Sequence, residues 1–273
     1  MNDDPLSAGD ALDFGRSSPA RVYNLYLGGR TAFEPDREAA EKVIAVSPDA
    51  PAVARENLGF AGRAAAWAVR TYGIGQVADL GVGILDDDIA LPSVEDQVRG
   101  VDSEARVLAF DNDPVVLVHA RCGRGYGRVL YGDVTDLDTV FGNPETGDAL
   151  DLSAPLVVVM AAVLHFVANP AAVMAELGRR LAPGSVVVLS HATTTATEAR
   201  RVDGMTKAYD KATSPIRFRS EEEIMALVDG WDLVDPPGLC DVAEWGLPQP
   251  HDGQVGEHVR VVGLVAVLPG GGR

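Results

Sequence analysis

Aspartates stand at the ends of three successive hydrophobic segments that read as strands: Asp79, Asp111 and Asp133. The carboxyl ends of parallel strands meet at one edge of a sheet, where ligands of doubly wound folds bind. There Asp111 can accept two hydrogen bonds from a ribose diol. Asp133 can accept one from the exocyclic amine of adenine, while the backbone N–H of Val134 donates to a ring nitrogen. These residues predict an adenosine pocket.

Two glycines follow the first of these strands, Gly81 and Gly83 in the sequence D-L-G-V-G. A glycine lets the main chain approach a ligand where a side chain would clash. Dinucleotide sites place pyrophosphate on a helix N-terminus, usually through G-x-G-x-x-G, but here the position of the third glycine holds Asp86. S-adenosylmethionine has no phosphate and carries two cationic groups that Asp79 would attract. We therefore predict S-adenosylmethionine and methyl transfer, and interpret the aspartates at 86–88 as a solvated loop.

A methyltransferase must align a nucleophile with the methyl carbon and exclude water. His165, after the fourth predicted strand, is the first candidate for a general base, with a role in ordering its loop as the alternative. His191 is a weaker candidate. Tyr23 is a further catalytic candidate, and Tyr23 and Tyr26 are expected to line the acceptor pocket or to pack against it. No metal ligands are expected.

The elements that must position these residues alternate between strand and helix. Runs of Val and Leu without polar alternation predict strands buried on both faces of a mainly parallel, doubly wound sheet. Two late strands are expected to pair antiparallel, and residues 21–33 read as a loop or a broken helix. Strands are predicted at 76–81, 105–113, 128–134, 154–166, 184–192, 231–236 and 258–268, and helices at 34–46, 52–72, 114–122, 170–181, 198–213 and from the Ser220 cap to Gly230.

The composition of the 273-residue chain narrows the class of partner. Lys and Arg number 23 against 40 Asp and Glu, a net charge of −17, which argues against nucleic acid and anionic membrane as partners. Two distant cysteines predict neither a disulfide framework nor a zinc site. We expect a cytoplasmic α/β protein that acts on a small molecule, with a homodimer left open. Residues 1–18 read as a disordered lead-in and 269–273 as a flexible tail.

The chain resembles the actinobacterial S-adenosylmethionine-dependent methyltransferase family formerly known as a domain of unknown function. The combination of Y-x-x-Y-L-G-G with D-N-D-P-V-V is specific. The resemblance implies a Rossmann-like class I methyltransferase fold, with seven strands and an antiparallel last strand, over 73–268. It implies a helical N-terminal extension over 19–72 that covers the cofactor. The matching segments are 19–43, 79–83, 109–121, 160–166, 181–193 and 208–224.

The resemblance also implies roles for individual residues. Asp79, Gly81 and Gly83 would hold the methionine part of the cofactor, Asp111 and Asn112 the ribose and the adjoining adenine edge, and Asp133 and Val134 the adenine; Tyr23, Gly28 and Gly29 would belong to the N-terminal cover.

One departure from the family keeps a second hypothesis open. Relatives continue G-T-G-L-P-T, whereas this chain has Val82 for the Thr and Leu85-Asp86 for the Pro-Thr pair, which removes a hydroxyl that could contact ligand. A non-catalytic module that binds S-adenosylmethionine or S-adenosylhomocysteine is therefore the alternative to an enzyme. A NAD-dependent oxidoreductase is less favoured because the third glycine is missing. The acidic segment between Asp79 and Asp111 reads as an exposed insertion.

Overall fold

A mixed sheet forms the centre of the protein, in a computed structural model that describes residues 13–122, 128–246 and 259–270. Its strands follow the order β3-β2-β1-β4-β5-β8-β6, with β7 paired to β8. Pairs among β1 to β5 are parallel, and every pair that involves β8 is antiparallel. The strands are β1 Gln76–Leu80, β2 Arg106–Asp111, β3 Val129–Tyr131, β4 Val157–Met160, β5 Val186–Thr193, β6 Asp232–Leu233, β7 Cys240–Asp241 and β8 Arg260–Val267.

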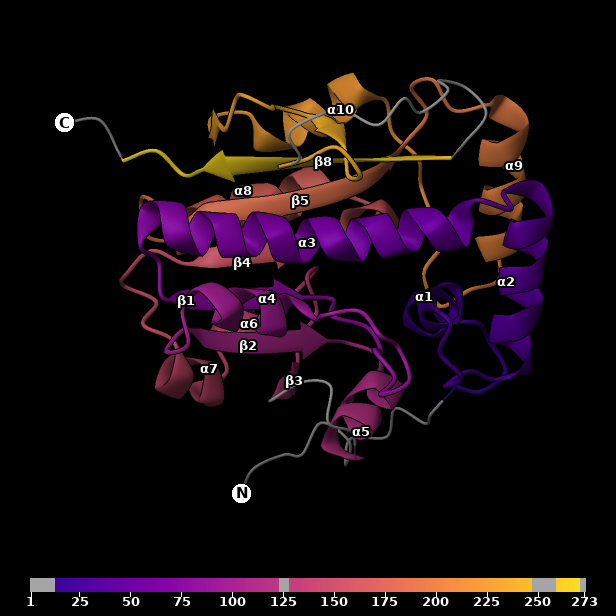
Figure 1. Ribbon diagram of the computed structural model, residues 1–273, viewed down its shortest axis with the longest axis horizontal. Helices are drawn as coiled ribbons and strands as arrows, with labels where there is room; N and C mark the ends of the chain where they lie inside the picture. The colour runs from indigo at the N-terminus through magenta and orange to yellow at the C-terminus, as the bar shows by residue number, and fades with distance from the viewer. Residues whose placement is uncertain (1–12, 123–127, 247–258, 271–273) are drawn as a thin grey trace.

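Helices cover both faces of the sheet, and α1, α2 and α9 gather beyond the end toward which the β2 arrow points (Figure 1). That end is the carboxyl edge of the parallel strands. The α-helices are α1 Pro19–Leu27, α2 Glu34–Val46, α3 Ala50–Tyr72, α4 Val94–Val101, α5 Pro114–Cys122, α6 Asp138–Phe141, α7 Pro144–Ala149, α8 Pro170–Arg180, α9 Ala199–Tyr209 and α10 Glu221–Met225, with 3₁₀ turns η1 Leu164–Phe166 and η2 Ala226–Val228.

The central strands are buried on both faces, as their Val and Leu runs predict. Every residue of β1, β4 and β5 is buried. One face packs against α3 and α4 through residues such as Phe60 and Val98. The opposite face packs against α8 through Val173 and Leu177. Apolar burial on two sides holds the strand ends rigidly, so loops that follow them have fixed starting points.

The predicted doubly wound sheet is confirmed, and so is the antiparallel pairing of the late strands. β8 pairs with β5 from Val186↔Val267 to Thr193↔Arg260 and also pairs with β6. Within the described ranges, the short β7 adds an eighth strand to the seven that the resemblance implies.

Most predicted helices are present. Those at 34–46 and 114–122 coincide with α2 and α5, and those at 52–72, 170–181 and 198–213 correspond to α3, α8 and α9 with shifted ends. The Ser220 Oγ accepts from the Glu223 N–H, as expected for a helix cap, and α10 continues into η2.

The segment 21–33, read as a loop or broken helix, belongs in its first part to a regular helix. Pro19 occupies the first turn of α1, and Gly28 ends the helix in the left-handed conformation, with φ +96°. The aromatic residues that obscured the period pack into a cluster with α2 and α9, including Tyr26 and Tyr209. Packing in this cluster, and not a pattern along the chain, therefore explains why the segment is helical.

The acidic segment after Asp79 is not simply an exposed insertion. It includes α4, which sequence reasoning missed. Ser93 caps this helix by accepting from the Asp96 N–H, while the Asp96 carboxylate accepts from the Ser93 N–H. Val94 and Val98 are buried against the sheet-covering face of α3. α4 is thus the crossover helix between the parallel strands β1 and β2.

Residues 1–18 were predicted to be a disordered lead-in, and the structure describes this segment from residue 13 onward. Ser17 and Ser18 are buried, and the Thr213 N–H donates to the Ser17 carbonyl at 2.8 Å. Ser17 and Ser18 are thus packed into the fold, residues 13–16 are exposed, and residues 1–12 and 271–273 of the predicted lead-in and tail lie outside the described residues. Among the described helices, none combines the length and apolar character that a bilayer crossing requires.

Candidate functional site

A cavity of about 780 Å³ lies at the carboxyl edge of the sheet, beneath the N-terminal helices. This volume lies within the range of small-molecule sites. Most of the predicted site residues line it: Asp79, Gly81, Gly83, Asp111, Asn112, Asp133, Val134, Tyr23 and His165. Gly28 and Gly29 are not among the residues that line it.

The glycine turn folds back onto the end of β2. Gly81 has φ +74° and Gly83 has φ +67°, conformations that favour glycine. A Cβ on Gly81 would come within 2.6 Å of Val163, so close packing also requires glycine there. The N–H groups of Gly81 and Val82 donate to the Phe110 carbonyl at 2.8 and 3.1 Å. The turn therefore brings bare backbone to the cavity.

Asp79 is a buried carboxylate that lacks a partner. No residue in the described part of the chain donates a hydrogen bond to it, and it is only 5% exposed. Burial, together with the charge of Asp111, raises the pKa of Asp79 to about 7. A buried ionised group without a partner is costly. A cationic ligand in the cavity would offset that cost, so this residue fits the ammonium or sulfonium of S-adenosylmethionine.

Asp111 is held by the backbone around it. Its Oδ2 accepts from the Gly83 N–H and its Oδ1 from the Asp113 N–H, both at 2.8 Å. Burial raises its pKa to about 6 despite these bonds. Each carboxylate oxygen has a second lone-pair site, so Asp111 keeps the capacity to accept from a diol.

The adenine candidates are organised around Asp133. Its Oδ1 accepts from the N–H and Oγ of Thr135, and its Oδ2 accepts from the Asn112 side-chain amide at 3.2 Å. No described residue accepts from the Val134 N–H, which leaves that donor available beside the cavity. The arrangement is compatible with the predicted adenine contacts, which stay a prediction.

The His165 ring is fixed by one backbone hydrogen bond. Its Nδ1 accepts from the Ala192 N–H at 3.2 Å, which requires the neutral tautomer with hydrogen on Nε2. Burial, with nearby His191 and Arg219, lowers the pKa of His165 well below its usual value. The ring lines the cavity with its hydrogen on Nε2, and this geometry does not support the predicted general base.

Both ring nitrogens of His191 have a hydrogen-bond partner in the structure. The Arg219 guanidinium donates to its Nε2 at 2.8 Å, and its Nδ1 bonds the Ala192 carbonyl at 2.7 Å. The side chain is fully buried, and burial lowers its pKa to about 4. His191 is not among the residues that line the cavity. Its contacts indicate a structural role.

Tyr23 lines the cavity but its hydroxyl is already committed. The hydroxyl donates to the Ala54 carbonyl at 2.7 Å and accepts from the Asn57 amide at 2.9 Å. The Asn57 carbonyl oxygen in turn accepts from the Ser190 hydroxyl at 2.5 Å. This chain of hydrogen bonds ties α1 and α3 to β5, and burial raises the pKa of Tyr23 above its usual range. The predicted catalytic role of Tyr23 thus gains no support; it packs and orients the cover.

Asp86 corrects the interpretation of 86–88 as a solvated loop. Its carboxylate accepts from the Thr31 N–H at 3.0 Å, from the Thr31 hydroxyl at 2.7 Å and from the Asn24 amide at 3.1 Å. The Arg30 N–H also donates to it, and the His119 Nε2 lies 2.9 Å away. We call this cluster the Asp86 clasp. It joins the cover to the loop that follows the glycine turn.

The clasp explains the glycine pair after α1. The left-handed Gly28 turns the chain so that the following N–H groups face Asp86. A Cβ on Gly29 would lie 2.2 Å from the Asn24 Oδ1. Gly28 and Gly29 thus shape the cover, and their predicted contact with cofactor stays a prediction.

Replacing Asp86 by alanine is expected to destabilise the protein by about 1–3 kcal/mol, because the buried Asn24 amide and the half-buried Thr31 donors lose a charged acceptor. Burial raises the pKa of Asp86, but these hydrogen bonds outweigh it and lower the pKa, so the contribution of Asp86 is present above the unfolded-state pKa and is lost as the pH falls through the lower folded-state pKa. Urea unfolding at pH 7 measures the loss. The matched control is Asp88→Ala, whose side chain is 63% exposed and pairs only with the exposed Arg30 among the described residues. Equal losses in both variants would contradict the clasp.

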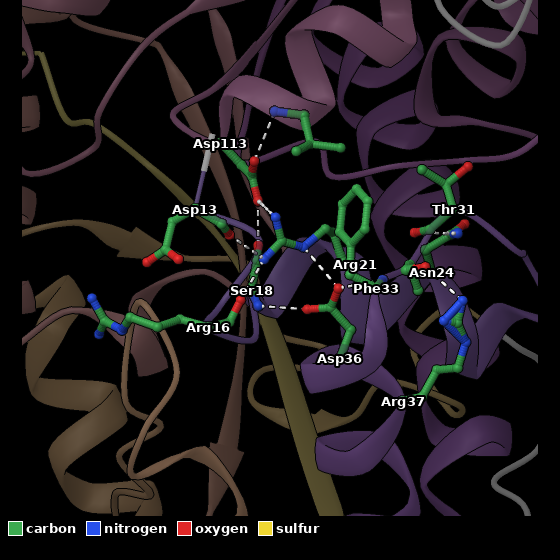
Figure 2. A network of polar contacts seen from close by, with 12 residues as sticks. Asp13, Arg16, Ser18, Arg21, Asn24, Thr31, Phe33, Asp36, Arg37 and Asp113 are labelled. Atoms are coloured by element: carbon green, nitrogen blue, oxygen red, sulfur yellow. Dashed lines mark hydrogen bonds and ion pairs between the residues drawn. The ribbon is translucent and has the colours of Figure 1, made fainter. Parts of the chain in front are cut away.

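A buried ionic network joins the cover to the loop after β2 (Figure 2). The Arg21 Nε lies 2.9 Å from the Asp36 carboxylate, and its Nη1 lies 4.0 Å from that of Asp113. The Ser18 N–H donates to Asp36, and its hydroxyl donates to Asp113. Arg21 and Asp36 are 2% and 0% exposed. Because Asp113 also accepts from Val115 at the start of α5, the network fixes α1 beside Asp111.

Sequence reasoning missed this network. Asp113 stands in D-N-D-P and Asp36 in the acidic first turn of α2. The signal that could have identified both is an acidic residue near the start of a helix. Nothing local pairs either of them with Arg21. Tyr209, which also lines the cavity, was missed because its predicted helix carried no site motif.

The family model described as S-adenosyl methyltransferase matches residues 6–269. The chain belongs to that family. S-adenosylmethionine is therefore its cofactor, in agreement with the unpartnered Asp79 at the cavity. The resemblance inferred from the sequence is confirmed, and the sheet is that of a Rossmann-like class I methyltransferase.

Two solved structures are similar over nearly the whole length of this methyltransferase family member. A candidate methyltransferase from Thermobifida fusca is 26% identical, with 96% of this chain and 98% of that chain covered and a TM-score of 0.84. A family protein from Streptomyces avermitilis, classed there as a domain of unknown function, is 28% identical, with 94% and 100% covered and the same TM-score of 0.84. No curated protein matches the chain.

Proposed function

We propose that the protein transfers a methyl group from S-adenosylmethionine to a small-molecule acceptor by in-line displacement. The observation that carries this proposal is the composition of the cavity. Carboxylates line it at the strand ends, where Asp79 and Asp111 stand, and apolar and aromatic side chains line it under the cover, among them Phe166 and Met205. One end suits a cationic nucleoside and the other an apolar acceptor.

The residues of the chain divide the task between them. Bound S-adenosylmethionine supplies a methyl group activated by its sulfonium. Asp79 would hold a cationic group, Asp111 the ribose, and Asp133 with Val134 the adenine. The cover, held by the Asp86 clasp and the Arg21 network, would exclude water and orient the acceptor.

Calorimetric titration with S-adenosylmethionine, S-adenosylhomocysteine and NAD tests the cofactor part. We expect the first two to bind and NAD not to bind. Tight NAD binding without a response to the other two would overturn the proposal. The acceptor part is tested by methyl transfer from labelled S-adenosylmethionine to compounds in a metabolite extract. Binding without transfer would favour the alternative, a non-catalytic binding module, which the altered turn at Val82 motivates.

Cofactor affinity is expected to weaken as the pH falls through 7 and 6, the values to which burial raises the pKa of Asp79 and Asp111. Both groups are protonated below those values, and a cationic ligand must then displace protons. While one proton is displaced, the dissociation constant rises about tenfold per pH unit. Calorimetry from pH 5 to 9 measures this. Asp79→Asn should bind more weakly at pH 8 and show a shallower profile; an unchanged profile would contradict the role of Asp79.

A further inference from the structure

Tyr26 and Tyr209 form a hydroxyl pair at the apolar end of the cavity. Their hydroxyl oxygens lie 3.3 Å apart, and the side chains are 5% and 3% exposed. Burial raises the pKa of both, that of Tyr209 to about 12, so both keep their protons. Two hydroxyls that bond each other use one of their two hydrogens. The other hydrogen has no acceptor among the described residues, although both side chains line the cavity.

His165 contributes a second donor to the same wall. With its Nδ1 occupied by the Ala192 N–H, its hydrogen is on Nε2, and no described residue accepts it. The rings stand in a row: the His165 and Phe166 centroids are 4.4 Å apart, and those of Phe166 and Tyr209 are 5.6 Å apart. The histidine donor and the tyrosine pair are thus joined by one aromatic ring. Donors that line a cavity and have no acceptor among the described residues favour a ligand atom that accepts.

The acceptor end is poor in bases. Of the carboxylates that line the cavity, Asp79, Asp111 and Asp133 belong to the cofactor end, and Asp113 is held by Arg21 and Ser18. Asp13 is exposed at the rim, where its Oδ1 accepts from the Gly15 N–H.

The remaining charge at the rim is positive. The Arg16 guanidinium donates to the Ala212 carbonyl at 2.5 Å, and no carboxylate in the described ranges pairs with it. Hydrogen-bond donors that line a cavity together with the Arg16 cation favour an oxyanion over an ammonium.

We propose that the methyl acceptor is a planar apolar compound that reacts through the acidic hydroxyl of a phenol or enol, and that His165 and the Tyr26–Tyr209 pair bind its oxyanion. This inference rests on the proposed function and names its substrate class. The acceptor loses its proton to solvent. Its oxygen then gives an electron pair to the methyl carbon as the carbon–sulfur bond breaks and its pair goes to sulfur. The products are a methyl ether or enol ether and S-adenosylhomocysteine. No protein base is needed, because the donors hold the nucleophile ionised.

The test uses the full chain with saturating S-adenosylhomocysteine and three probes that share a nitrophenyl ring and differ in the group para to the nitro group: 4-nitrophenol, 4-nitroaniline and 4-nitroanisole. Absorbance reports whether bound nitrophenol is ionised. We expect the phenolate to bind at least about tenfold more tightly than the other two probes, and the pKa of the bound phenol to fall by about one unit, as for a buried hydrogen bond to a charged group.

The tyrosine pair predicts a non-additive pattern of variants. Tyr26→Phe and Tyr209→Phe should each keep most of the phenolate affinity, because the remaining hydroxyl still has a hydrogen to donate. The double variant should lose about tenfold. His165→Asn, whose side-chain oxygen can still accept from Ala192, should also lose about tenfold by removing the second donor. Tyr72→Phe, at an exposed tyrosine outside the cavity lining, is the control.

The outcomes separate the two proposals. If S-adenosylhomocysteine fails to bind the wild type, the proposed function fails. If it binds but the three probes bind equally, or none of them binds, the substrate assignment is overturned. A double variant with the affinity of the single variants also overturns it. Thermal melting and S-adenosylhomocysteine affinity, measured for every variant, distinguish loss of fold from loss of the acceptor site.

Discussion

Replacing Arg21 by methionine is expected to lower the free energy of unfolding by about 3–5 kcal/mol, because one partner of a buried ion pair is removed. The variant leaves the Asp36 carboxylate, which is 0% exposed, without its cation 2.9 Å away. It also removes the positive charge nearest to Asp113 in this network. Urea unfolding followed by circular dichroism measures the loss, and protection of α1 against hydrogen exchange should fall with it.

Two further variants make this result specific. Arg37→Met removes an exposed guanidinium that donates to the Ala32 carbonyl, and it should change stability little. Combining Arg21→Met with Asp36→Leu should recover part of the loss, because the fully buried Asp36 carboxylate is then removed together with its cation. A double variant as unstable as the sum of its single variants would show that packing of the Arg21 side chain, and not the ion pair, holds the cover.

Replacing Asp111 by asparagine is expected to weaken S-adenosylmethionine binding by about 100-fold or more. Two hydrogen bonds from a ribose diol to a carboxylate are lost or weakened, each worth about 1.5–3 kcal/mol. The amide also turns an N–H₂ group toward one of the two backbone donors, Gly83 or Asp113, that now bond the carboxylate. The glycine turn should therefore shift as well. Calorimetry at pH 8, where the carboxylate of the wild type is ionised, measures the change.

The matched control is Asp148→Asn, the same chemical change at an exposed residue of α7 outside the cavity lining. Its cofactor affinity should equal that of the wild type. An Asp111→Asn variant that melts like the wild type without cofactor, yet binds weakly, would assign the effect to the ligand contact. Unchanged affinity in Asp111→Asn would contradict the ribose assignment.

The amino-acid sequence was sufficient to predict the sheet and the edge of the sheet at which the cavity lies. Runs of Val and Leu mark strands buried on both faces, because only a sheet covered by helices buries every residue of β1, β4 and β5. The carboxyl ends of parallel strands lie together by topology, so Asp79, Asp111 and Asp133 meet in one cavity without further information. These features depend only on the order of residues along the chain, so the sequence is enough to predict them.

The tertiary structure alone decided how the side chains around that cavity are used. The sequence predicted that Asp86 belongs to a solvated acidic loop. In the structure its carboxylate accepts hydrogen bonds from the N-terminal cover, for example from Thr31, which is 55 residues away in the chain, because the left-handed Gly28 turns backbone donors toward it. His165 looked like a base, and the Ala192 N–H, 27 residues away, makes it a donor. Tyr26 and Tyr209 are 183 residues apart. Protonation, burial and hydrogen-bond partners depend on neighbours in space, which a pattern along the chain does not contain.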